Sequence, residues 1–249
     1  LELGGDGVEM TTGGWSSAPH LPTEALLASA TQRQSLLKAL ESRGMSIAAL
    51  NVSGNPLDPG ELGQKHKRDT ENALALAGEL GVKKIVMMSG LPPASPHDTI
   101  PNWITYTVSW PPTLKNCLDY QWNEVAIPYW QGLVARAKQS GVEKFALENF
   151  SSMLVWNPET LFRLRNAVGD MVGLNLDPSH LLWMGADPIA AARALGPAIH
   201  HCHGKDVRMG RGLVGISGLL ETKPVEDVAN RAWNYVAVGC GQDLKWWKE

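Results

Sequence analysis

Three residues with metal-binding side chains are spaced along the sequence at intervals of about one strand plus one helix. Glu148 ends the run "KFALE", Asp177 follows "VGLNL", and His203 follows "AIHHC". Asp177 comes 29 residues after Glu148 (177 − 148), and His203 comes 26 residues after Asp177 (203 − 177). Two carboxylates and one imidazole form a mixed oxygen and nitrogen set that suits Mn²⁺, Mg²⁺, Co²⁺ or Zn²⁺. Without a cation, two adjacent carboxylates repel each other and one tends to hold its proton.

A simpler interpretation exists for the same residues. Acidic residues at strand ends commonly cap the helix that follows, so Glu148 and Asp177 could have that role alone. His180, three residues after Asp177, could then be an incidental histidine in a turn. The spacing by itself leaves the metal site and the helix caps both open.

Short apolar segments alternate with helical patterns along the chain, and this rhythm predicts a parallel sheet. The predicted strands cover 7–10, 47–52, 84–90, 144–150, 172–177 and 198–206. Helices are predicted over 23–43, 65–80, 124–140 and 187–196, with another that begins at Pro158. A Pro- and Trp-rich segment, 91–123, is predicted to be a long loop that serves as a lid or a subunit contact. The last residues, "DLKWWKE", are predicted to begin one more helix.

Six such units fit either an open doubly wound sheet or a barrel. No GxGxxG follows the first strand and the sequence contains no P-loop motif, which disfavours a nucleotide-binding Rossmann fold. Polar residues instead occur at successive strand ends: Glu9, Asn51, Ser89, Glu148, Asp177 and His203. In a barrel these ends form one rim, where the loops build the active site. The pattern therefore favours the barrel.

The remaining histidines are weaker candidates for a site. Alternation along a strand places His201 and His203 on one face and His200 on the other. A pair at i and i+2 could chelate a metal, but the favoured arrangement puts His203 at the rim and His201 one layer deeper. His66 follows "SGNPLDPG" at the start of a helix and is a further candidate for ligand contact.

Composition narrows the class of protein. The chain has 249 residues, is 44% hydrophobic and carries a formal net charge of −3, and this length fits one α/β barrel as well as two small domains. We expect a single domain over 1–249. The acidic balance and the lack of a basic block argue against a nucleic-acid partner. No apolar run approaches the roughly 20 residues of a membrane span. Three cysteines without CxxC spacing make a disulfide framework improbable, so we expect a cytoplasmic protein.

Several longer segments carry a resemblance to a known family. They are "NVSGNPLDP", "MMSG", "NPETLFRLRNAVG", "LNLDPSHLLWMGADPIAAARALG", "HHCHGKD" and "WNYVAVGCG". Together they resemble the sugar phosphate isomerase/epimerase family of xylose-isomerase-like TIM barrels. The resemblance implies a (β/α)₈ barrel that binds one divalent cation through Glu, Asp, His and a last Glu. We expect Mn²⁺ in this site, with Mg²⁺, Co²⁺ or Zn²⁺ as the alternatives. It also implies substrates of sugar or inositol type and a place in carbohydrate metabolism.

The resemblance assigns roles to individual residues. Glu148, Asp177 and His203 match the first three metal ligands, and Glu148 would also be the catalytic acid/base. His180 matches the histidine that reaches the substrate's hydroxyl groups. Lys205 and Asp206 fall in the polar segment after the ligand histidine and are predicted substrate contacts, as are Asn51 and His66 at this rim. Where the family often has a methionine-histidine pair, this chain has Asn149 and Phe150.

The two ends depart from the family pattern. "LELGGDGVEM" resembles the end of the first helix and the second strand, and "WWKE" resembles the start of the last helix. The first strand and the last strand, which carries the fourth ligand glutamate, are therefore not matched. We expect an incomplete TIM barrel and a fragment of a longer protein.

The resemblance implies proton transfer at a carbon next to a carbonyl, through an enediolate, as an isomerase or epimerase performs it. The same chemistry also serves a lyase or dehydratase acting on a keto-sugar or an inosose. A degenerate, non-catalytic barrel that acts as a subunit is a third alternative, which the absence of a fourth ligand favours. The related AP endonucleases are disfavoured by the acidic charge. The expected partners are a small-molecule substrate and a second copy of the chain in a homo-oligomer.

Overall fold

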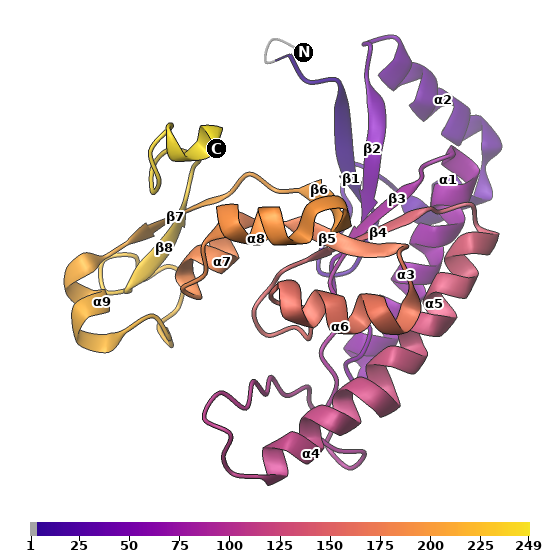
Figure 1. Ribbon diagram of the computed structural model, residues 1–249. Coiled ribbons are helices and arrows are strands. Elements are labelled where there is room, and N and C mark those ends of the chain that lie inside the picture. The colour runs from indigo at the N-terminus through magenta and orange to yellow at the C-terminus, as the bar shows by residue number, and fades with distance from the viewer. Residues whose placement is uncertain (1–3) are drawn as a thin grey trace.

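A curled sheet of six parallel strands forms the centre of the protein (Figure 1). The computed structural model describes residues 4–249. In sequence order and in spatial order the strands are β1 (Gly7–Thr11), β2 (Ser46–Asn51), β3 (Lys84–Met87), β4 (Lys144–Glu148), β5 (Val172–Leu176) and β6 (Ile199–Cys202). Each pairs in parallel with the next. All six predicted strands are confirmed, and their curl gives the sheet the architecture of a TIM barrel.

Helices connect the strands and cover the outer face of the sheet (Figure 1). They are α1 (Thr23–Ala28), α2 (Ala30–Glu41), α3 (Glu61–Leu80), α4 (Thr113–Asp119), α5 (Ile127–Gln139), α6 (Pro158–Val168), α7 (Pro178–Trp183) and α8 (Pro188–Leu195). The prediction of one helix over 23–43 is wrong. Ser29 is extended there, and its side chain accepts a hydrogen bond from the amide of Gln32 and so starts a second helix.

The segment around the predicted long loop is more ordered than the sequence indicated. Residues 88–112 are irregular, but α4 begins at Thr113 and continues through a π-helical stretch, Tyr120–Ala126, into α5. Gln121, which is fully buried, donates to the carbonyls of Pro92 and Asn102 and ties the irregular segment to this long helix.

The C-terminal part forms a separate antiparallel pair. The predicted strand 198–206 is interrupted at 203–205, and the chain continues as β7 (Asp206–Met209), α9 (Arg211–Ser217) and β8 (Trp233–Val236). The ring of Trp233 stacks on that of Trp183, with centroids 4.8 Å apart, and this contact holds the hairpin against α7. The predicted terminal helix is only a 3₁₀ turn, Trp246–Lys248.

Alternation along the strands separates two faces with different chemistry. Side chains toward the helices are large and fully buried, among them Leu50, Ile85, Phe145, Leu147 and Leu174. The opposite face carries small side chains, and Ala49, Val86 and Ala146 form a cluster of their own. Two residues further along this inner face come Asn51 in β2 and Glu148 in β4. The register pairs Glu148 with Asn175 of β5, so polar groups form a layer at the carboxyl ends of the strands.

Candidate metal centre and catalytic site

Glu148 lies at the middle of this polar layer. The residue is only 6% exposed, and its two carboxylate oxygens contact two different histidines. Oε1 is 3.0 Å from His180 Nε2, and Oε2 is 3.4 Å from His203 Nδ1. Burial raises the pKa of the Glu148 carboxyl, but the hydrogen bonds with His180 and His203 outweigh it and hold the pKa well below its usual range. Glu148 is therefore a carboxylate at neutral pH.

Asp177 uses its two oxygens for different purposes. Oδ1 caps α7, because it accepts hydrogen bonds from the amide of Ser179 at 2.9 Å and from the Ser179 hydroxyl at 2.5 Å. Oδ2 is buried and accepts no hydrogen bond, and it faces His180 Nε2 at 3.4 Å. The helix cap considered from sequence is thus real, and it leaves the second oxygen directed into the polar layer.

Asn149 fixes the main chain at this point. Its side chain accepts from the Asp177 amide at 2.8 Å and donates to the Asp177 carbonyl at 2.9 Å. Both bonds join the end of β4 to the end of β5. Asn149, which departs from the family pattern, therefore holds the backbone on which Glu148 and Asp177 are mounted.

The Lys205 ammonium lies where the acceptor groups converge. Its Nζ is 2.8 Å from Asp177 Oδ2, 3.0 Å from His180 Nε2 and 3.7 Å from Glu148 Oε1. The distance to Asp177 makes an ion pair, although the geometry is not that of a hydrogen bond. One ligand atom each from Glu148, Asp177 and His180 lie within 4.8 Å of one another. A donor set that already surrounds one positive charge fits a divalent cation.

His180 is fully buried and is oriented from several sides. The hydroxyl of Tyr235, in β8, lies 3.0 Å from His180 Nδ1, and the Phe150 ring centroid lies 4.7 Å from that of His180. Burial and the Asp177 carboxylate raise the pKa of the Tyr235 hydroxyl, which therefore stays protonated. The sequence predicts no role for Tyr235, because no pattern in the sequence places β8 beside α7.

His203 lies between two carboxylates, Glu9 of the edge strand β1 and Glu148 of the interior strand β4. Its Nε2 is 3.1 Å from Glu9 Oε2, while its Nδ1 faces Glu148 and also lies 2.9 Å from Asn175 Nδ2. Hydrogen bonds with Glu148 and Glu9 raise the pKa of His203 to about 10. The ligand atoms therefore form two neighbouring sets, one of Glu148, Asp177 and His180 and the other of Glu9, His201 and His203. His203 lies between them.

The other predicted contacts are distributed differently. Asn51 reaches the rim, where it donates to Glu9 Oε1 at 2.6 Å. His66 is buried in α3, where its Nδ1 accepts from the Asn55 amide at 2.9 Å. Asp206 accepts hydrogen bonds from the amides of Gly239, Gly241 and Gln242 and from the Trp247 indole. The described contacts of His66 and Asp206 are with main-chain amides and the Trp247 indole, and their role as substrate contacts remains a prediction.

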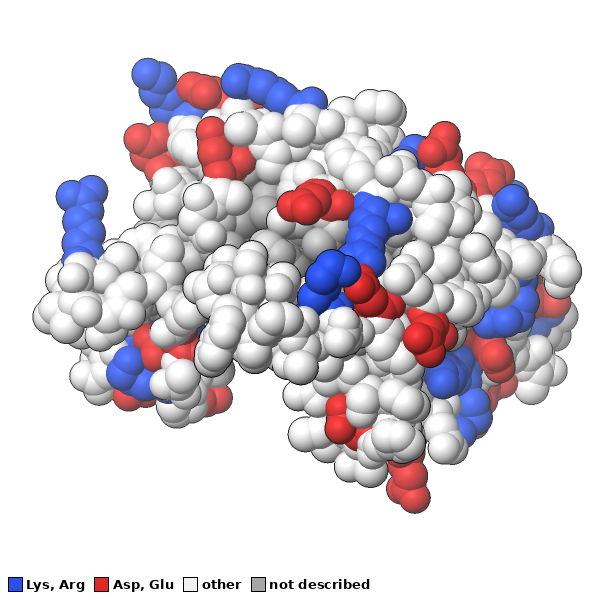
Figure 2. Space-filling view, turned by 60° about the horizontal axis from the view of Figure 1, so that its bottom comes forward, with Lys and Arg blue, Asp and Glu red and all other residues white. Residues whose placement is uncertain are grey.

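The surface is mixed in charge. Figure 2 shows acidic and basic side chains interspersed over one face of the molecule, without a continuous basic stripe on that face. Within residues 4–249, none of the helices combines the length and the apolar character needed to cross a membrane.

Comparisons with known proteins agree with this architecture. The sequence matches the family described as "Xylose isomerase-like TIM barrel" over residues 1–249. The "Uncharacterized protein YfiH" of Bacillus subtilis (strain 168) is 69% identical over 248 residues, which cover 100% of this chain and 79% of that protein.

Three solved structures share the fold at low sequence identity. The probable 3-DHS dehydratase AsbF of Bacillus anthracis has a TM-score of 0.58 at 17% identity, covering 87% of this chain and 68% of its own. A D-tagatose 3-epimerase-like protein has a TM-score of 0.54 at 20% identity, and the match covers 82% of this chain and 68% of that protein's chain. The IOLI protein with a binding zinc atom has a TM-score of 0.57 at 19% identity, and the match covers 89% of this chain and 78% of that protein's chain. With its curled parallel sheet and the match along the whole sequence, the chain belongs to the xylose isomerase-like TIM barrel family.

Proposed function

We propose that this protein is a divalent-cation-dependent isomerase or epimerase that transfers a proton at a carbon next to a carbonyl of a sugar, keto-sugar or inositol-type substrate. The observation that carries the proposal is Asp177 Oδ2, a buried carboxylate oxygen without a hydrogen bond that faces His180 and the Lys205 ammonium. Such an oxygen is costly to bury without a positive charge beside it. The Lys205 ammonium provides that charge at 2.8 Å, and a divalent cation would supply it when bound. Enzymes of related fold include an epimerase-like protein and a probable dehydratase.

Glu148, Asp177 and His203 would hold the cation, as the family resemblance implies. His203 Nδ1 lies 3.4 Å from Glu148 Oε2, whereas the ligand atoms that lie within 4.8 Å of one another are those of the two carboxylates and His180. When bound, the cation supplies Lewis-acid polarisation of the substrate carbonyl and a template for a neighbouring hydroxyl. The two carboxylates favour Mn²⁺, Mg²⁺ or Co²⁺, and the zinc atom of the IOLI protein supports a divalent ion more generally. We favour Mn²⁺.

The chain's own residues would then handle the proton and the hydroxyl groups. Glu148 is ionised, so it can accept the proton from the carbon on its side of the substrate and return it. His180, with its Nε2 beside Glu148, would bind a substrate hydroxyl, and Tyr235 holds its ring in that orientation. The Lys205 ammonium would bind a substrate oxygen and balance negative charge that develops on it.

A lyase or dehydratase is the second candidate, and the position of Lys205 favours it. Its Nζ lies 3.7 Å from the proton-accepting carboxylate of Glu148, on the same side as His180 Nε2. An acid beside a base can protonate a hydroxyl that leaves from the next carbon, which converts the same proton abstraction into loss of water. The probable dehydratase among the proteins of like fold is consistent with this outcome.

Both candidates predict removal of a carbon-bound proton next to the carbonyl, followed by its return from solvent in the isomerase or by loss of water in the lyase. Purified protein with Mn²⁺ is incubated with a panel of ketoses and inososes in D₂O, and the products are followed by proton NMR and mass spectrometry. Deuterium at the carbon next to the carbonyl with an isomeric product supports the isomerase, and a product lacking one water supports the lyase. Binding of a substrate with neither deuterium incorporation nor loss of water across the panel would contradict both and favour a non-catalytic barrel.

A further inference from the structure

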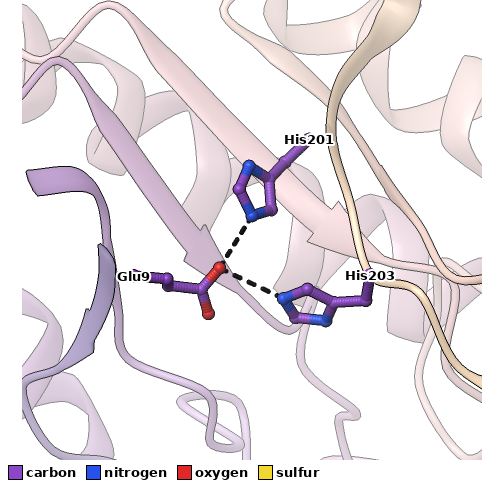
Figure 3. A group of neighbouring side chains, drawn as sticks. All are labelled: Glu9, His201 and His203. Carbon is purple, nitrogen blue, oxygen red and sulfur yellow. Dashed lines mark hydrogen bonds and ion pairs between the residues drawn. The ribbon is translucent and has the colours of Figure 1, made fainter. Parts of the chain in front are cut away.

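We propose a second cation site, of zinc type, formed by Glu9, His201 and His203 between the two edge strands β1 and β6 (Figure 3). This set is distinct from the centre proposed above, although His203 contributes to both through different ring nitrogens. The expected ligand is a Zn²⁺ ion, and Co²⁺ is its spectroscopic substitute.

The ligand atoms already have the separation that a tetrahedral ion requires. Glu9 Oε2 is 2.8 Å from His201 Nε2 and 3.1 Å from His203 Nε2, and the three atoms lie within 4.8 Å of one another. Around zinc, with bonds of about 2.0 to 2.1 Å, ligand atoms stand roughly 3.3 Å apart in a tetrahedron. In Figure 3 both rings point their nitrogens at the same carboxylate oxygen. Small side-chain shifts would therefore place an ion among the three atoms.

Neighbouring groups hold these ligands in place. Asn51 Nδ2 donates to Glu9 Oε1 at 2.6 Å, which leaves Oε2 directed at the two histidines. Asn175 contacts the far nitrogen of His203 at 2.9 Å and so restrains its ring. Partners of this kind orient metal ligands and typically change metal affinity by about 10- to 100-fold. Asn51 and Asn175 thus orient the proposed ligands, as the hydrogen-bonding neighbours of metal ligands do.

The site is accessible, and its chemistry differs from that of the first centre. The side chains of Glu9, His201 and His203 are 21%, 18% and 30% exposed, so an ion can enter from solvent and water can fill a fourth position. Two imidazoles and one carboxylate make the His₂Glu set that zinc commonly takes with a water ligand. The carboxylate-rich centre at Glu148 and Asp177 suits Mn²⁺ or Mg²⁺ better. The two sites therefore differ in the metal ion that each prefers.

An ion here must displace protons. Hydrogen bonds to a single carboxylate oxygen require that each histidine place a proton on Nε2, and both protons leave when a cation binds there. His203 must also give up its Nδ1 proton if the first centre uses that nitrogen. The alternative is that Glu9 only forms ion pairs that join the two edge strands, and zinc stoichiometry separates these two interpretations.

The test measures zinc equivalents in chelator-treated protein by equilibrium dialysis and elemental analysis. Wild-type protein is expected to bind about two equivalents, and Glu9→Gln and His201→Gln about one each. His200→Gln is the matched control, because His200 contacts the Phe145 carbonyl at 2.9 Å and is not among the ligands, so it should keep two. The Co²⁺ form should also show the visible absorption of a tetrahedral site, and His201→Gln should lose it.

The first centre is tested in parallel with Asp177→Asn, so that the two proposals can fail separately. Loss of one equivalent in His201→Gln with no loss in Asp177→Asn would support the second site and contradict the first centre. Zinc content equal to that of wild-type protein in both Glu9→Gln and His201→Gln would overturn the second site, whether wild-type protein binds one equivalent or two. Far-UV circular dichroism identifies a misfolded variant. If either Glu9→Gln or His201→Gln misfolds, the zinc content of the other variant tests the site.

Discussion

Glu148 Oε1 lies 3.0 Å from His180 Nε2, although the two residues are 32 positions apart and belong to successive strand–helix units. Glu148 ends β4, while His180 lies in the first turns of α7, directly after β5. This contact places a carboxylate that can move a proton beside a histidine that can bind a hydroxyl.

His180→Ala should retain the cation and lose substrate binding or turnover. The expected fall in turnover is on the order of 10² to 10⁴, typical for loss of a group that assists proton transfer. Metal content by elemental analysis and turnover with Mn²⁺ are measured on the same preparation. Loss of the metal with an otherwise native circular dichroism spectrum would instead make His180 a ligand, in keeping with its distance of 3.4 Å from Asp177 Oδ2.

Lys205→Met should bind the cation more tightly and the substrate more weakly. The ammonium lies 2.8 Å from Asp177 Oδ2, so its removal relieves repulsion of an incoming cation and also removes a donor to the substrate. We expect metal affinity to rise roughly 2- to 10-fold at low salt, as screened charge interactions of this kind allow.

Lys83→Met is the matched control for this variant. Lys83 pairs with Glu143 on the surface, and its side chain is 58% exposed. Isothermal titration with Mn²⁺ should give the wild-type affinity for Lys83→Met. Weaker metal binding in Lys205→Met than in this control would show that Lys205 supports the cation rather than competing with it.

Tyr235→Phe should lower kcat more than it raises KM. The hydroxyl contacts His180 Nδ1 at 3.0 Å, whereas the ring also contacts Trp233 and the Lys205 ammonium, and phenylalanine keeps the ring. The lost hydrogen bond should also reduce the free energy of unfolding by about 1 kcal/mol. Unchanged kcat with the same loss of stability would mean that Tyr235 only supports the fold.

His203 should make the stability of chelator-treated protein depend on pH. Its pKa is about 10 in the folded protein because of Glu148 and Glu9, and an unfolded histidine has a pKa of about 6.5. The stabilisation is therefore fully present below about pH 6.5 and is lost as the pH rises through about 10. The difference in free energy of unfolding between wild type and His203→Asn should shrink over this window. A constant difference would contradict the ion pairs.

Much of the site could be predicted because parallel strands end at one rim. The spacing of Glu148, Asp177 and His203 follows the strand–helix repeat, and the structure places all three at consecutive strand ends. Their roles as ligands remain a proposal. Tyr235 could not be found, since it arrives through an antiparallel hairpin whose pairing has no local signature. The contact between Glu9 and His203 spans 194 positions and depends on how far the sheet curls, which no local pattern encodes.

The helix boundaries show the same limit at a smaller scale. The sequence over 23–43 has one continuous helical pattern, but Ser29 is extended and separates two helices. A serine is common both at the first position of a helix and on a helix surface, so the pattern did not indicate the break. Asp177 illustrates the reverse case. The sequence left helix cap and site ligand open as roles of Asp177. In the structure Oδ1 caps α7, and Oδ2, which accepts no hydrogen bond, is the oxygen proposed to bind the cation.

The central claim is that Asp177 helps to hold a divalent cation. Asp177→Asn keeps an oxygen that can cap α7, because asparagine caps helices as well as aspartate does. The fold should therefore persist while the buried charge is lost. Asp187→Asn is the matched control, since Asp187 caps α8 in the same way through the amide of Ile189 and belongs to neither of the two ligand sets.

The most direct test is the Mn²⁺ content and affinity of these two variants beside wild type, with circular dichroism to establish folding. We predict that Asp177→Asn weakens Mn²⁺ binding by at least roughly 100-fold, since even outer partners of a metal ligand contribute about 10- to 100-fold. Asp187→Asn should bind Mn²⁺ as wild type does. Wild-type Mn²⁺ content and affinity in folded Asp177→Asn would contradict the metal centre proposed for this protein.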